Sequence, residues 1–165
     1  MNRHDSIRGW FAYELYQHML KDKDIWVVVG DLGFGMFDAI KRDFPDRFLN
    51  TGAAEQAMMG IACGLALEGK KPFVYSITTF LLYRPFETIR NYISNERIPV
   101  RLCGSGRDQD YHIDGFSHDS TDAKRILKTA FPNINTLWPD IKEEIPEMVN
   151  WMVNNNEPSF TSLKR

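Results

Sequence analysis

The stretch Ile25-Trp26-Val27-Val28-Val29-Gly30 is a continuous apolar run that ends in a glycine. An uninterrupted apolar run of this length is typical of a strand that is buried on both faces of a parallel sheet. Valine and isoleucine dominate the run, and their branched side chains also favour a strand. The run therefore indicates a sheet with helices on both sides.

Strands and helices alternate outward from this run. Before it, apolar residues between Ile7 and Met19 recur at helical spacing, after an Asp5-Ser6 pair that is suited to capping a helix. Further strands are expected at residues 47–50, 72–75, 100–103, 135–137 and 159–163, and further helices at residues 37–44, 54–67, 86–94, 123–129 and 141–152, where Pro146 must kink or restart the last helix. This alternation predicts an α/β fold, a three-layer sandwich with a mainly parallel sheet, in a single domain over residues 1–165.

Composition and charge exclude several classes of protein. The chain has 165 residues, with 20 Lys and Arg against 22 Asp and Glu, so it lacks the basic excess of a nucleic-acid-binding protein. No window approaches the roughly 20 apolar residues of a membrane span. The first five residues do not resemble a secretory signal. Cys63 and Cys103 form no CxxC pair, and we interpret them as buried, reduced thiols. We therefore expect a cytoplasmic protein without a nucleic-acid or membrane partner.

One edge of the expected sheet collects the polar loops. Ligands of open parallel sheets bind outside the carboxyl ends of the strands. Four of the expected strands are followed there by glycine-bearing or polar segments, at residues 30–33, 50–52, 76–80 and 104–120. This edge is the expected position of a binding or catalytic site.

Glu55 is the most informative residue near this edge. It follows a glycine turn in the sequence Asn50-Thr51-Gly52-Ala53-Ala54-Glu55-Gln56 and opens a helix of small apolar residues. Two interpretations of the residues alone stay open. Glu55 complements the helix dipole in the first turn, or a rigid helix holds its carboxylate at a ligand site.

The segment from residue 50 to residue 76 resembles the pyrimidine-binding domain of transketolases, in which a glycine turn precedes Ala-Glu-Gln, a helix of small residues and a strand. The other matches occur in the same order as in that family, over residues 26–138. They are Gly30-Asp31-Leu32-Gly33, which is similar to an Asp-Leu turn, Phe80-Leu81-Leu82-Tyr83-Arg84, which is similar to an aromatic pyrimidine-contact segment, and Asp114-Gly115-Phe116-Ser117-His118, which is similar to a Gly-Pro-Thr/Ser-His substrate loop. The resemblance implies a thiamine diphosphate-binding fold.

The resemblance implies catalytic roles for two residues. Glu55 would hydrogen-bond the aminopyrimidine ring of thiamine diphosphate, and the ring's exocyclic nitrogen would then remove a proton from the thiazolium carbon. His118 would face the substrate and either hydrogen-bond ketose hydroxyls or assist proton transfer.

The resemblance also implies contacts to the cofactor. Phe80 would stack on the pyrimidine ring, and Tyr83 is a second candidate contact. Asp31 and Leu32 would line the cofactor cleft near the thiazolium ring. Ile77 departs from the family pattern, because many transketolases have an aromatic residue there.

The loop around His118 allows other interpretations. His112, Asp114, His118 and Asp119 are all plausible metal ligands, and the loop is otherwise an ordinary solvated polar segment. We expect no metal here, because no second ligand cluster accompanies it in the sequence. Asp119 departs from the family pattern and would orient His118 or alter substrate preference.

The chain does not contain every motif of the family. Transketolase-like enzymes hold the diphosphate and its Mg²⁺ on a separate domain with a Gly-Asp-Gly…Asn-Asn motif, which is absent here, and the chain ends at Arg165 before a third domain. The resemblance thus implies the pyrimidine-binding subunit of a heteromeric enzyme that transfers a two-carbon ketol unit between sugars or sugar phosphates. Thiamine diphosphate would be bound between subunits, with Mg²⁺ on the partner chain.

The expected partner is a diphosphate-binding transketolase-like subunit, in a heterotetramer or a homodimer of heterodimers. Three alternatives stay open. They are a subunit of a thiamine diphosphate-dependent 2-oxo acid decarboxylase or dehydrogenase, a non-catalytic stabilising subunit, and a metal-dependent hydrolase built on the His-Asp loop.

Overall fold

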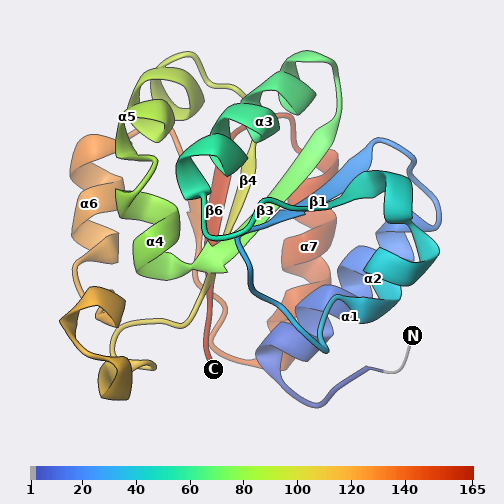
Figure 1. The fold of residues 1–165 in the computed structure, drawn as a ribbon, viewed down its shortest axis with the longest axis horizontal. Coiled ribbons are helices and arrows are strands. Elements are labelled where there is room, and N and C mark those ends of the chain that lie inside the picture. The colour runs from blue at the N-terminus through green and yellow to red at the C-terminus, as the bar shows by residue number, and fades with distance from the viewer. Residues whose placement is uncertain (1–2) are drawn as a thin grey trace.

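A six-stranded parallel sheet forms the centre of the structure, a computed structural model that describes residues 3–165 (Figure 1). The strands are β1 (Ile25–Val29), β2 (Phe48–Asn50), β3 (Lys71–Ile77), β4 (Arg101–Ser105), β5 (Asn135–Leu137) and β6 (Ser159–Leu163). They lie in the order β2-β1-β3-β4-β6-β5, and every pair of neighbours is parallel. The predicted α/β class is confirmed.

The helices lie close to where the sequence predicts them. They are α1 (Ile7–Met19), α2 (Asp38–Asp43), α3 (Glu55–Leu67), α4 (Thr78–Tyr83), α5 (Phe86–Thr88), α6 (Ala123–Ala130) and α7 (Ile145–Asn154), with a π-helical segment η2 (Ile89–Asn95) and the 3₁₀ turns η1 (Pro45–Arg47), η3 (His112–Asp114), η4 (Phe116–His118) and η5 (Lys142–Glu144). The Ser6 hydroxyl accepts the Gly9 N–H at 3.0 Å and so caps α1 as expected. Pro146 restarts the last helix, because it occupies the first turn of α7 after η5.

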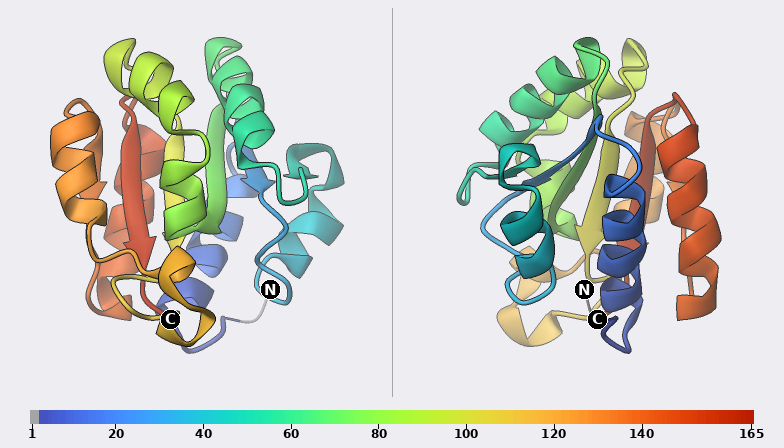
Figure 2. Two further views of the ribbon diagram at one scale, coloured as in Figure 1. Left: turned by 60° about the vertical axis from the view of Figure 1, so that its left-hand side comes forward. Right: turned by 90° about the vertical axis from the view of Figure 1, so that its right-hand side faces the viewer.

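The two faces of the sheet are covered by different helices. In Figure 2 helices α1 and α7 lie on one side of the sheet, and α3, α4 and α5 lie on the other. Val27 and Val29 of β1 belong to the core that includes α1 and α7, whereas Val28 belongs to the core that includes α3. Because successive side chains of a strand point to opposite faces, both faces of β1 are buried, which explains its continuous apolar run.

Helix α4 is the main difference from the sequence prediction, which expected only a connection there. The Thr78 hydroxyl donates to the Gly106 carbonyl at 2.5 Å and so ties the first turn of α4 to the end of β4. A side chain at Gly104 would collide with Thr78, so α4 and β4 approach closely because residue 104 has no Cβ. These contacts join residues far apart in the sequence, which local patterns do not reveal.

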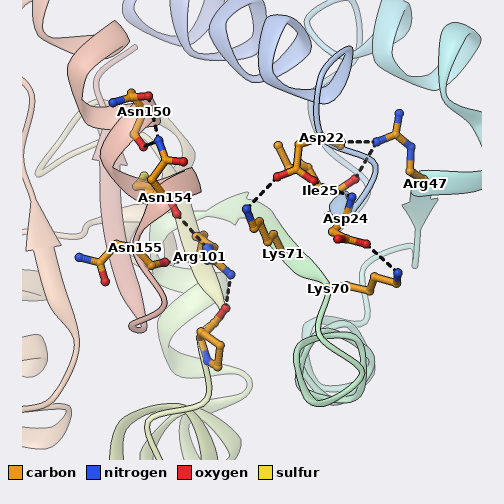
Figure 3. Close-up of polar contacts among 12 residues, drawn as sticks. Asp22, Asp24, Ile25, Arg47, Lys70, Lys71, Arg101, Asn150, Asn154 and Asn155 are labelled. Atoms are coloured by element: carbon orange, nitrogen blue, oxygen red, sulfur yellow. Dashed lines mark hydrogen bonds and ion pairs between the residues drawn. The ribbon is translucent and has the colours of Figure 1, made fainter.

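The amino end of the sheet is held by buried and partly buried polar contacts (Figure 3). Arg101 is 1% exposed and donates to the main-chain carbonyls of Met152 at 3.0 Å, Pro99 at 2.5 Å and Asn155 at 2.8 Å. Burial lowers the pKa of Arg101 to about 10. Arg101 therefore fixes the end of α7 to β4, at the edge opposite the candidate site.

Cys63 and Cys103 are free and buried, as predicted. Burial raises the pKa of the Cys63 thiol to about 11, so this sulfur is held in its neutral form. Within residues 3–165, no helix has the length and apolar character needed to cross a membrane.

Candidate active site

The candidate site lies where the direction of the chain connections reverses. From β1 the chain passes to β2 at one side, and then returns through α3 to β3 on the other side of β1. The carboxyl ends of β1 and β3 therefore flank a topological switch point, the usual position of a ligand site in an open parallel sheet. Gly30 follows β1 at this point, and Ser76 lies near the end of β3.

Glu55 places a buried carboxylate at the switch point. It is the first residue of α3 and is 2% exposed. Its Oε1 accepts the Ser76 hydroxyl at 2.8 Å, and its Oε2 accepts Nη1 of Arg84 at 2.6 Å. The positive end of the α3 dipole also favours a negative charge here. Both sequence interpretations of Glu55 are therefore compatible with its position, and its partners come from β3 and from the residue that follows α4.

Gly30 leaves room for this carboxylate. A Cβ at residue 30 would lie 3.2 Å from Oε1 of Glu55 and 3.2 Å from Oγ of Ser76. Gly30 thus permits the carboxylate to approach the end of β1. Its place after the apolar run was visible in the sequence, but the group that it accommodates was not.

Phe80 lies beside this carboxylate on α4. The Arg84 guanidinium carbon is 3.8 Å from the centre of the Phe80 ring, so one guanidinium contacts both Phe80 and Glu55. The His118 ring packs edgewise on Phe80, with 4.9 Å between ring centroids. The Thr79 hydroxyl donates to the Ser117 carbonyl at 2.8 Å and anchors the loop that carries His118. The structure therefore brings three of the expected site residues together: Glu55, Phe80 and His118.

Tyr83 is engaged elsewhere. Its hydroxyl donates to Asp122 at the start of α6. Partial burial and then this hydrogen bond raise the pKa of the Tyr83 phenol. The expected contact of Tyr83 with a cofactor stays a prediction.

Asp31 and Leu32 lie in the loop after β1 and have different surroundings. Asp31 is exposed and has a positive φ of 53°, and its N–H donates to the Asn50 side chain at 3.1 Å. Leu32 lines a cavity of about 520 Å³ together with Arg8 and Tyr75. Tyr75 precedes Ser76 in β3, so this cavity lies on the α1 face of the sheet whereas Glu55 lies on the α3 face.

The loop after β4 contains the residues that the sequence offered as metal ligands. Within the described part of the chain, no group of three or more His, Cys, Asp or Glu side chains is arranged to hold a metal ion. Nδ1 of His112 lies 3.1 Å from the Gln109 carbonyl, and that of His118 lies 3.0 Å from the Ser117 hydroxyl. The backbone N–H of Thr121 holds the pKa of Asp119 below its usual value. These separate local partners give no support to the metal alternative.

Comparison with known proteins identifies the family. The sequence matches the family described as "Transketolase, pyrimidine binding domain" over residues 6–165. The chain belongs to this family.

Similar proteins include split forms of transketolase. A "Putative transketolase C-terminal section" of Methanocaldococcus jannaschii is 30% identical over 161 residues, which cover 97% of this chain and 51% of that protein. A subunit of apulose-4-phosphate transketolase from Phocaeicola vulgatus is 29% identical with the same coverage. A solved structure described as "Split gene transketolase, inactive beta4 tetramer" superposes with a TM-score of 0.85 and 26% identity, over 98% of this chain and 52% of that one. The chain spans about half the length of these relatives.

Three residues of this transketolase pyrimidine-binding domain were not predicted as site residues. Ser76 and Arg84 are the hydrogen-bond partners of Glu55, although both lie within segments that carry the family resemblance. Arg8 donates from Nη1 to the Tyr111 hydroxyl at 2.9 Å, and it lines the cavity on the α1 face. In the sequence Arg8 is only one polar residue of the expected first helix, so no local signal marks it.

Proposed function

We propose that this chain is the pyrimidine-binding subunit of a thiamine diphosphate-dependent, transketolase-like enzyme that transfers a two-carbon ketol unit between sugars or sugar phosphates. The observation that carries the proposal is the pairing of a buried carboxylate with an aromatic ring at the switch point. Glu55 and Phe80 lie close enough for one guanidinium to contact both. An aminopyrimidine needs the same pair of contacts, a carboxylate at a ring nitrogen and an aromatic face.

The residues of this chain fit the pyrimidine end of the cofactor. When bound, thiamine diphosphate supplies a thiazolium carbon that can lose a proton and attack a carbonyl group. The Glu55 carboxyl group would hydrogen-bond a ring nitrogen and share one proton with it, donating when the proton is on Glu55 and accepting when it is on the ring. Ser76 would keep that carboxylate in place through its 2.8 Å hydrogen bond, and Phe80 would exclude water from one face of the ring.

The substrate would lie toward His118 and the cavity that contains Arg8. His118 packs against Phe80 and would therefore lie near the reacting carbonyl. Within residues 3–165, the hydrogen bonds of the Arg8 guanidinium are with the neutral hydroxyls of Tyr111 and Ser105. A partly buried guanidinium with neutral partners is suited to an anion, so a phosphorylated sugar is the substrate that this cavity favours.

A partner chain would complete the site. Large apolar side chains are exposed in the loops after β1 and β4, where Phe34 is 76%, Ile113 74% and Phe116 93% exposed. Exposed apolar groups in this number favour a protein interface. The relatives are named as a subunit and as a C-terminal section, and both names describe parts of larger assemblies. We propose that residues 1–165 act as one domain beside a chain that binds the diphosphate and Mg²⁺.

The proposal is tested through the proton-transfer role of Glu55. The Glu55→Gln variant keeps the shape of the side chain but cannot exchange a proton with the ring. In the complex with a diphosphate-binding chain, we expect hydrogen-deuterium exchange at the thiazolium carbon to slow at least about a hundredfold, while thiamine diphosphate still binds.

The matched control is Glu68→Gln, at the other end of α3, where the side chain is exposed. This change should leave the exchange rate unaltered. An unchanged rate in Glu55→Gln would contradict the proposal and favour a non-catalytic stabilising subunit.

A further inference from the structure

Arg84 holds both contacts that define the pyrimidine half of the site. Its Nη1 donates to Oε2 of Glu55 at 2.6 Å, while its guanidinium carbon lies 3.8 Å from the centre of the Phe80 ring. A guanidinium is planar, carries N–H donors in its plane and stacks on aromatic faces. An aminopyrimidine is also planar, has nitrogen atoms in its plane and stacks in the same way.

Among the groups that surround the Glu55 carboxylate, Arg84 is the one that lies toward solvent. The Glu55 side chain is 1% exposed, whereas that of Arg84 is 43% exposed. Ser76 holds the other carboxylate oxygen, and Gly30 packs beside the same oxygen from the end of β1. A ring that approaches Oε2 and the face of Phe80 must therefore take the space that the guanidinium occupies.

We propose that Arg84 is a placeholder for the aminopyrimidine, which occupies the ring's position in the free chain and is displaced when the ring enters. This inference rests on the proposed function. A buried carboxylate without a partner is costly, so Arg84 compensates the charge of Glu55 in the free chain. When the ring replaces the guanidinium, one proton taken up at the ring nitrogen or at Oε2 replaces that compensation. Arg84 follows the last residue of α4, and rotation of its own side chain moves the guanidinium into solvent without unfolding a helix.

The placeholder makes a prediction that is opposite in sign to that of a supporting residue. If Arg84 competes with the ring, its removal strengthens binding of the pyrimidine. If Arg84 instead orients Glu55 for the bound ring, its removal weakens binding. Affinity for the pyrimidine alone therefore separates the two roles without any measurement of catalysis.

The probe is 4-amino-5-(hydroxymethyl)-2-methylpyrimidine, titrated into the isotope-labelled full chain and followed by NMR chemical shifts. We expect Arg84→Ala to bind this compound at least about tenfold more tightly than the unaltered chain. Arg84→Lys keeps the charge but lacks the planar face, so its affinity should lie between the two. Arg90→Ala is the matched control, because Arg90 is an exposed arginine of η2 whose guanidinium contacts the Asn91 side chain.

Equal or weaker binding of the pyrimidine by Arg84→Ala would overturn the placeholder. It would also be overturned if neither Arg84→Ala nor the unaltered chain bound the pyrimidine. Cooperative thermal unfolding establishes that each variant is folded. If Arg84→Ala does not fold, the placeholder requires that Arg84→Lys bind the pyrimidine more tightly than the unaltered chain does. Glu55→Gln in the Arg84→Ala background separates this failure from failure of the proposed function. Binding that depends on Glu55 but not on Arg84 contradicts the placeholder alone, whereas binding that does not depend on Glu55 contradicts the proposed site itself.

Discussion

At the scale of single residues, the sequence identified Glu55 as a site residue but did not identify the residues that contact it. Glu55 was found because it stands at the start of a helix of small residues, which is a local pattern. Its partners Ser76 and Arg84 are 21 and 29 residues away in the sequence, and only the arrangement of β3 and α4 brings them to it. Local patterns therefore predict where a functional group stands, but not which groups complete its environment.

His118 is the residue whose role is most easily separated from the cofactor. It touches Phe80 but has no described contact with Glu55. We expect His118→Ala to lower kcat/KM of the assembled enzyme about tenfold to a hundredfold, the effect of losing a hydrogen bond to a group that gains charge. Exchange at the thiazolium carbon should stay unchanged, because Glu55 and the ring are intact.

His112→Ala is the control for this variant, because His112 is exposed in the same loop. It should leave kcat/KM unchanged. A metal bound at one per chain and lost in both variants, measured by elemental analysis of the purified chain, would contradict the substrate role of this loop.

At the scale of elements, the strands and long helices were predictable and the short helices near the site were not. The strand Ile25–Val29 was predictable because a short, continuous apolar run that ends in a glycine is typical of a strand buried on both faces. Helix α4 has six residues and depends on the hydroxyls of Thr78 and Thr79, which bind β4 and η4. The expected helix over residues 86–94 divides into α5 and the π-helical η2. Tertiary contacts therefore decide the structure where the sequence pattern is weakest, which includes the segment that carries Phe80.

Arg101 provides a test of how elements are joined at the amino end of the sheet. Arg101→Met keeps an apolar stem but leaves three main-chain carbonyls without their donor. We expect the free energy of unfolding in urea to fall by about 2–4 kcal/mol, because unpaired buried polar groups are costly.

Lys70→Met is the comparison, since the Lys70–Asp24 ion pair is partly exposed (Figure 3). Its loss should cost less than about 1 kcal/mol. Equal losses in the two variants would mean that burial of Arg101 contributes nothing particular to stability.

At the scale of the whole molecule, the order of the strands was beyond the sequence prediction. Alternation of strands and helices indicates a parallel sheet, but it does not say on which side of β1 each later strand is added. That order creates the switch point at β1 and β3, and it places Glu55 and the Arg8 cavity on opposite faces of the same edge. The site is therefore a property of the assembled sheet rather than of any one motif.

The outer face of α3 provides the last prediction, which concerns assembly. From Gln56 to Leu67 this helix contains no charged residue, and Gly60, Ile61 and Gly64 are exposed. A Cβ at Gly64 would meet no atom within 4 Å. Gly64→Ala should therefore stabilise the isolated chain by about 0.5–1 kcal/mol in urea unfolding, since glycine is unfavourable inside a helix.

Gly64→Glu should have a different effect if the diphosphate-binding chain covers this face. A carboxylate introduced there would be buried without a partner, so association with the diphosphate-binding chain should weaken at least about tenfold in sedimentation velocity. Thr129→Glu adds the same charge on the exposed side of α6 and should leave association unchanged. If Gly64→Glu assembles as well as the unaltered chain, the α3 face is not the interface, and the exposed Phe34 and Phe116 at the carboxyl edge become the surface to test.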